Sequence, residues 1–141
     1  MLLLTKIFRF EMAHALHGYP GKCKNIHGHS YKLYVTVKAG EEMHGYIPAP
    51  GILLDFKEIK QLVRTTIVNR LDHQLILSGD YIKAHPSIIL EDNLLLWEAE
   101  PSAENLLIFI RKTLQQKLPD GIELVKLKLY ETNDSYAEWV A

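Results

Sequence analysis

The stretch from His27 to Val37 reads HGHSYKLYVTV and alternates with the two-residue period of a half-buried β-strand. Its histidines and most of its apolar residues fall on one face, while Ser30 and Lys32 fall on the other. Residues 8–14, with the sequence FRFEMAH, alternate in the same way and put His14 on the apolar face. If the two strands pair as a hairpin, three histidines meet at one end of the core face.

These three histidines, His14, His27 and His29, predict a metal site. Residues at i and i+2 share a strand face, and Gly28 between them leaves room for a close approach. A lone histidine near an apolar strand is more often a hydrogen-bonded core residue, but three in phase favour metal binding. Three imidazoles with an open fourth position are typical of catalytic zinc, whereas structural zinc usually has four ligands rich in cysteine. We therefore expect a reactive zinc centre.

A cysteine and an adjacent Asp-His pair are further candidates for proton transfer. Cys23 lies between Lys22 and Lys24, whose charges would stabilise a thiolate, although a single buried cysteine mostly behaves as a small hydrophobe. Asp72 and His73 come at the end of a predicted helix, where a histidine also interacts favourably with the helix dipole. A carboxylate beside an imidazole also suits proton relay. The residues alone leave both alternatives open for each candidate.

Two glutamates are candidates for ligand binding. Glu131 continues a strand face formed by Val125, Leu127 and Leu129, and a buried carboxylate there needs donors. A ligand with a planar pair of donors, such as a pterin or guanine ring, would satisfy both oxygens. The alternative is a solvated side chain at a turn. Glu104 lies in the first turn of a predicted helix, which favours an acid in any case.

Length and composition indicate one ordinary globular domain spanning residues 1–141. The chain has 141 residues, 48% of them hydrophobic. A formal net charge of -1 argues against a nucleic-acid partner. The apolar N-terminus is too short for a signal peptide, and no stretch is long enough to span a membrane. With one cysteine, we expect a cytoplasmic protein without a disulfide.

The order of predicted elements is two strands, two helices and two strands, an α+β fold with both helices on one face of an antiparallel sheet. The first helix begins at Asp55 and ends near Leu71, and the second is capped by Ser102. The last two strands cover residues 124–131 and a segment through Val140. Residues 78–100 are expected to be irregular, with a short hairpin formed by residues 87–90 and 94–97.

Such a four-stranded sheet leaves an edge strand at each end. Proteins usually cover or pair such edges, and pairing with identical subunits is the simplest solution. An open sheet repeated around an axis can close into a barrel. We therefore expect a cyclic oligomer with sites at its interfaces.

Several motifs found together in this order resemble the 6-pyruvoyl-tetrahydropterin synthase / 6-carboxytetrahydropterin synthase family. The resemblance covers nearly the whole chain, and it rests on His14, Cys23-x-x-x-His27-Gly28-His29, Leu71-Asp72-His73, Pro101-Ser102-Ala103-Glu104-Asn105 and Tyr130-Glu131-Thr132. It implies the tunnelling fold (T-fold), a ββααββ unit that oligomerises into a barrel, commonly as a homohexamer built from two trimers with intersubunit sites.

The resemblance also implies roles for individual residues. The three histidines would bind Zn²⁺, Cys23 would act as the general base, and Asp72 with His73 would relay protons from a neighbouring subunit. Glu131 would anchor the pterin, and Glu104 matches another family acid near the pterin pocket. Ser102, where Thr is frequent in the family, keeps the capping chemistry.

The gap of three residues between Cys23 and His27 is similar to that of bacterial 6-carboxy-5,6,7,8-tetrahydropterin synthases of queuosine biosynthesis. The implied activity is that of a zinc-dependent lyase that converts 7,8-dihydroneopterin triphosphate to 6-carboxytetrahydropterin, acetaldehyde and triphosphate. Alternatives are a 6-pyruvoyl-tetrahydropterin synthase, a dihydropterin side-chain aldolase, a hydrolase that uses zinc-bound water, and a non-catalytic pterin or purine binder. No Gly-rich loop indicates where the triphosphate would bind.

Overall fold

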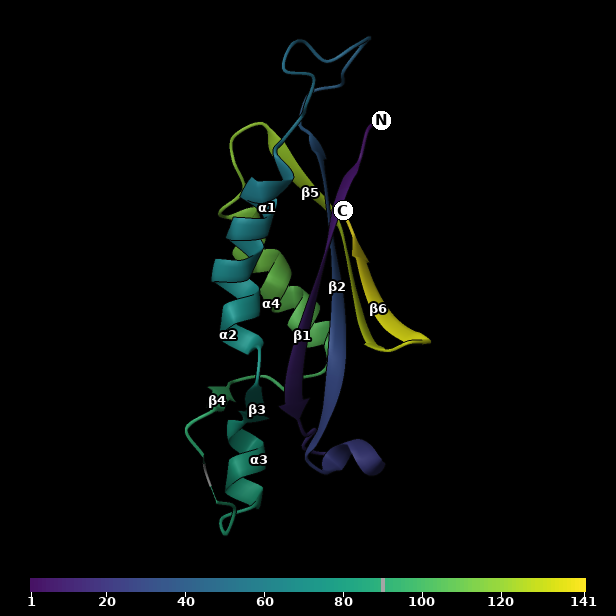
Figure 1. Cartoon of the computed structure of the whole chain (residues 1–141). Coiled ribbons are helices and arrows are strands. Elements are labelled where there is room, and N and C mark those ends of the chain that lie inside the picture. The colour runs from purple at the N-terminus through teal and green to yellow at the C-terminus, as the bar shows by residue number, and fades with distance from the viewer. Residues whose placement is uncertain (90) are drawn as a thin grey trace.

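The computed structural model describes residues 1–89 and 91–141 and centres on one six-stranded mixed sheet (Figure 1). The strand order is β4-β3-β1-β2-β5-β6. Four of the strands are joined by antiparallel pairing: β1 (Leu4–His14), β2 (His27–Ala39), β5 (Ile122–Thr132) and β6 (Ser135–Val140). Two short strands, β3 (Gln74–Ser78) and β4 (Leu94–Trp97), extend the sheet beyond β1.

The predicted hairpin between the first two strands is confirmed. His14 lies opposite His27, Met12 opposite His29, and Phe8 opposite Leu33. The alternation seen in the sequence is visible in the burial of the two strands, because Phe8, Phe10 and Met12 and, on β2, Tyr31, Leu33, Val35 and Val37 are all buried. Apolar phase therefore sets the register that brings the histidines to one end of the sheet.

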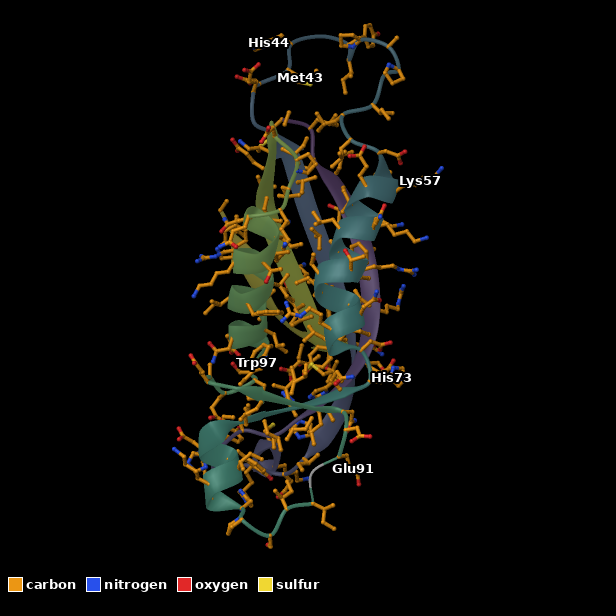
Figure 2. All side chains as sticks on the ribbon, turned by 90° about the vertical axis from the view of Figure 1, so that its left-hand side faces the viewer. Met43, His44, Lys57, His73, Glu91 and Trp97 are labelled. Carbon is orange, nitrogen blue, oxygen red and sulfur yellow. The ribbon has the colours of Figure 1, made fainter. Side chains whose placement is uncertain are left out.

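The main helices cover one face of the sheet, as the sequence predicts (Figures 1 and 2). Helix α1 (Phe56–Val63) begins at Asp55, whose carboxylate accepts the backbone N-H of Lys57 at 2.8 Å. A π-helical turn η2 (Arg64–Val68) and the short α2 (Asn69–Leu71) continue it to the expected end. The predicted cap of α4 (Ala103–Gln115) is also confirmed, because the Ser102 hydroxyl accepts the backbone N-H of Asn105 at 3.2 Å.

The core lies between this helical layer and the sheet. The apolar faces of α1, η2 and α4 pack on those of β1, β2 and β5, and the fully buried side chains of this cluster include Leu33, Ile59, Ile67, Leu106, Ile110 and Leu127. Two smaller elements, η1 (Lys22–Lys24) and α3 (Gly79–Ala84), lie near the end of the sheet at which the histidines gather. Among the helices in the described residues, none is both long and apolar enough to cross a membrane.

Three details of the sequence prediction are wrong. The sheet has six strands where four were expected, because Gln74–Ser78 forms a strand parallel to the end of β1. The expected hairpin of residues 87–90 with 94–97 is absent from the described residues, since β4 pairs in parallel with β3 instead, and Leu90 lies outside them. Leu124, not Val125, is buried on the core face, because the β2-β5 register shifts between Thr36 and Val37.

Candidate metal centre and active site

The hairpin brings the three predicted ligands together. His14 ends β1, while His27 and His29 begin β2, and one ring nitrogen from each lies within 4.8 Å of the others. His14 is almost fully buried, at 1% exposure, and the other two are partly buried. The group can therefore hold one metal ion, and the strand pairing alone sets its spacing.

The hydrogen bonds of His14 and His27 orient both rings. His14 Nδ1 lies 2.6 Å from the carbonyl oxygen of Pro101, and His27 Nδ1 lies 2.7 Å from that of Asn25. A carbonyl oxygen only accepts, so each Nδ1 carries the proton and donates it. In the neutral rings both Nε2 atoms then present lone pairs, and these two atoms are 3.0 Å apart. Two lone pairs at this distance repel unless a proton or a metal ion lies between them.

The third histidine has a nitrogen without a hydrogen bond. Within the described residues, His29 Nε2 is buried and makes none, although it lies at ion-pair distance, 3.2 Å, from Glu131 Oε2. Burial lowers the pKa of both His14 and His29, which keeps the imidazoles neutral and able to donate a lone pair. Three imidazoles in one group, two of them held by backbone carbonyls, fit a divalent transition metal.

Tyr31 lies beside the histidines. Its hydroxyl is 3.5 Å from His14 Nδ1, and its side chain is buried. Burial, followed by the charges of Glu131 and Cys23, raises the pKa of Tyr31 well above its usual value. Cys23 is half-buried in η1, and its carbonyl accepts the backbone N-H of Leu16 at 2.9 Å.

The two glutamates predicted to bind the ligand lie together. Glu104 and Glu131 line one cavity of about 210 Å³ between the start of α4 and the β5-β6 turn, together with Ala103, Ser135, Tyr136 and Ala137. Because Glu131 also lies beside His29, this cavity is next to the histidine cluster. The sequence predicted Glu131 on the core face but gave no sign of its contact with His29.

Asp72 and His73 form a separate pair at the edge of the sheet. His73 Nδ1 lies 3.0 Å from Asp72 Oδ2, and the backbone N-H of Glu11 donates to Asp72 Oδ1 at 2.8 Å. The Glu11 N-H, followed by the contacts with His73, lowers the pKa of the Asp72 carboxyl. His73 has a left-handed backbone (φ 60°), and its side chain is 78% exposed. In the described part of the chain, no hydrogen bond or ion pair joins this pair to Cys23 or to the histidine cluster.

Sequence reasoning missed the groups that orient the metal ligands. The carbonyl oxygens of Pro101 and Asn25 belong to the backbone, which any residue supplies, so no residue type marks them. Tyr31 was predicted on the correct face, but only its neighbours show that its hydroxyl points toward His14.

Known proteins resemble this chain over most or nearly all of its length. Residues 3–141 match the family described as 6-pyruvoyl tetrahydropterin synthase. A 6-carboxy-5,6,7,8-tetrahydropterin synthase from Haemophilus influenzae is 31% identical over 145 residues, with 99% of each chain covered. A human 6-pyruvoyl tetrahydrobiopterin synthase is 33% identical over 119 residues, covering 82% of this chain and 68% of its own.

Among solved structures, the 6-pyruvoyl tetrahydropterin synthase of Caenorhabditis elegans superposes with a TM-score of 0.70 at 20% identity, covering 99% of this chain and 95% of its own. This likeness confirms the T-fold expected from the sequence. The full-length family match and the similarity to tetrahydropterin synthases lead to one conclusion: the chain belongs to the 6-pyruvoyl tetrahydropterin synthase family of enzymes.

Proposed function

We propose that this protein is a zinc-dependent 6-carboxy-5,6,7,8-tetrahydropterin synthase that acts on 7,8-dihydroneopterin triphosphate. The observation that carries the metal requirement is the pair of facing Nε2 lone pairs of His14 and His27, 3.0 Å apart. The choice of the carboxy product is supported by relatives of that name at about 30% identity over nearly the full chain.

His14, His27 and His29 would hold the ion. Zinc is favoured because three neutral imidazoles with an open fourth position are its usual catalytic ligand set. When bound, the ion supplies Lewis-acid polarisation of the substrate's side-chain oxygens. The carbonyls of Pro101 and Asn25 keep the Nδ1 protons of His14 and His27 in place, so that both Nε2 atoms stay available.

Glu131 would anchor the pterin ring. Its carboxylate can accept two N-H groups from the edge of the ring, by the bidentate geometry that makes such pairs strong. Glu104 lines the same cavity and would contribute to this binding. Because Glu131 also lies 3.2 Å from His29, a ring held there would have its side chain next to the histidine cluster.

Cys23 would move the proton on the substrate's side chain, as the general base. Cys23 lies in η1, which ends three residues before β2 begins at His27, and this supports a place for the thiol near the histidine cluster. Asp72 and His73 would relay the proton from a neighbouring subunit. Two observations support this arrangement. Within one chain, no hydrogen bond or ion pair joins Asp72 or His73 to Cys23 or to the histidine cluster in the described residues. They also lie beside the part of the β1 edge that has no strand partner in the described residues. We further propose a cytoplasmic homohexamer, a dimer of trimers.

Anaerobic incubation of the zinc-loaded protein with 7,8-dihydroneopterin triphosphate tests this function. We expect release of triphosphate and acetaldehyde. Cys23→Ala should keep its zinc and lose turnover, whereas the control His44→Ala should keep both, because His44 is exposed in the loop after β2, at the end of the sheet opposite the histidine cluster (Figure 2). A wild-type protein that releases no triphosphate would contradict the lyase, and full activity in Cys23→Ala would remove the thiol from its role.

A second candidate is the 6-pyruvoyl product. The human relative with the pyruvoyl name is 33% identical, so identity does not separate the two activities. It aligns over only 68% of its own length, whereas the carboxy relative aligns over 99%. Triphosphate release without acetaldehyde would favour the pyruvoyl product.

A further inference from the structure

A cleft of about 470 Å³ lies between the free side of β1 and the helix that packs against it. On the helical side it extends along α1, η2 and α2, and its lining residues are Lys6, Ile7, Phe8, Arg9, Lys60, Arg64, Val68, Asn69 and Asp72. The charged residues among them are four cations and one carboxylate. This cleft is distinct from the cavity of Glu104 and Glu131.

Among the described residues, the cations of the cleft lack acidic partners. In the described part of the chain, no carboxylate lies within ion-pair distance of Lys6, Arg9, Lys60 or Arg64. Lys60 and Arg64 are four positions apart on one helix, where like charges repel each other. Asp72 does not neutralise them, because its oxygens already contact the Glu11 N-H and His73. A concave site with unpaired cations attracts an anion.

We propose that this cleft binds the polyphosphate chain of the pterin substrate, which rests on the proposed function. Lysine and arginine are the residues that bind phosphate oxygens, as point charges and through paired N-H donors respectively. An extended cleft with several cations along its walls matches an extended triphosphate better than a single phosphate. The cleft would therefore serve as the triphosphate site, in place of the Gly-rich loop that the sequence lacks.

The cleft would serve the histidine cluster of an adjacent copy. Arg9 and His14 are five residues apart on β1, which corresponds to about 17 Å along a strand. This is much further than the few bonds between the substrate's side-chain hydroxyls and its first phosphate. Asp72, the proposed relay residue for a neighbouring site, itself lines the cleft. A copy that brought its cluster to Asp72 and His73 would therefore place the substrate's phosphates at the cleft.

The edge of the sheet has room for such a copy. β3 pairs with β1 only from Met12 to His14, so in the described residues the earlier part of this edge has no strand partner. Such an edge is a template for pairing with another chain.

Binding of inorganic triphosphate to the zinc-loaded full chain, measured by calorimetry, tests the proposal without turnover. Lys60→Ala and Arg64→Ala should each weaken binding by about 10-fold or more, because each removes a charge-assisted contact. Arg64→Lys should recover part of it. Lys57→Ala is the matched control, because Lys57 lies in the first turn of the same helix, points outward and does not line the cleft (Figure 2).

Substrate kinetics provide the second measurement. The cleft variants should raise the KM for 7,8-dihydroneopterin triphosphate and leave the binding of dephosphorylated 7,8-dihydroneopterin unchanged. Wild-type affinity for triphosphate in both alanine variants would overturn the proposal. The proposal would also be overturned by alanine variants that bind triphosphate normally but no longer assemble in size-exclusion chromatography. In that case the cations would contact acidic groups of another subunit. Triphosphate binding through the cleft without turnover would instead contradict the proposed function.

Discussion

Zinc binding should stabilise the folded chain, because the geometry of the ligands exists only in the folded state. His14 and His27 are thirteen residues apart in the sequence, and their Nε2 atoms come within 3.0 Å only in the folded hairpin. The unfolded chain therefore has no comparable site, and zinc binds the native state selectively. Free zinc at about 100 times its dissociation constant then stabilises the fold by about 2.7 kcal/mol.

A chelator removes the metal, and the thermal unfolding midpoint is then measured with and without added zinc. For a chain of this length each kcal/mol corresponds to about 2–4 °C, so zinc should raise the midpoint by about 5–10 °C. His27→Ala should unfold at the same temperature with or without zinc. The control His44→Ala should keep the full shift, because His44 is exposed in the loop after β2. An unchanged midpoint in the wild type, or a full shift in His27→Ala, would refute the reasoning from the facing lone pairs.

Three further predictions concern single side chains. Asp72→Asn should reduce the loss of unfolding free energy at acid pH, which urea unfolding from pH 6 to pH 2 measures. The pKa of this carboxyl is lower in the folded than in the unfolded chain. Its stabilisation is therefore present above the unfolded pKa and is lost as pH falls through the folded pKa. Randomly mixed oligomers of Cys23→Ala and His73→Ala should regain about a quarter of wild-type activity. A site then works only where one subunit keeps Cys23 and its neighbour keeps His73, and each condition holds in about half of the sites. Inactive mixed oligomers would contradict an intersubunit site. Glu131→Gln should weaken pterin binding by about 10- to 100-fold in a fluorescence titration while zinc content is unchanged, and equal affinity would exclude the anchor.

The parts of the molecule that follow from local pattern could be predicted from the sequence. Alternation through Phe10, Met12 and His14 and through His29 and Tyr31 predicted the hairpin, because a one-residue slip would bury the wrong face. The carboxylate of Asp55 and the hydroxyl of Ser102 marked both helix starts, because each satisfies a free backbone N-H.

The remaining features depend on contacts between distant segments. Gln74–Ser78 is a short run without alternation, and its parallel pairing with β1 is set by a partner far away in the sequence. The register shift that buries Leu124 in place of Val125 is likewise a property of the β2-β5 pair. The four cations of the cleft come from three elements, β1, α1 and η2, so no motif in the sequence predicted that they would lie together.

The mass of the pterin product distinguishes the proposed activity from its alternatives. Zinc-loaded protein, incubated anaerobically with 7,8-dihydroneopterin triphosphate, should yield a pterin with the mass of 6-carboxy-5,6,7,8-tetrahydropterin, and the chelator-treated protein should regain this activity when zinc is restored. A product with the mass of 6-pyruvoyl-tetrahydropterin, or unchanged substrate in the presence of zinc, would contradict it.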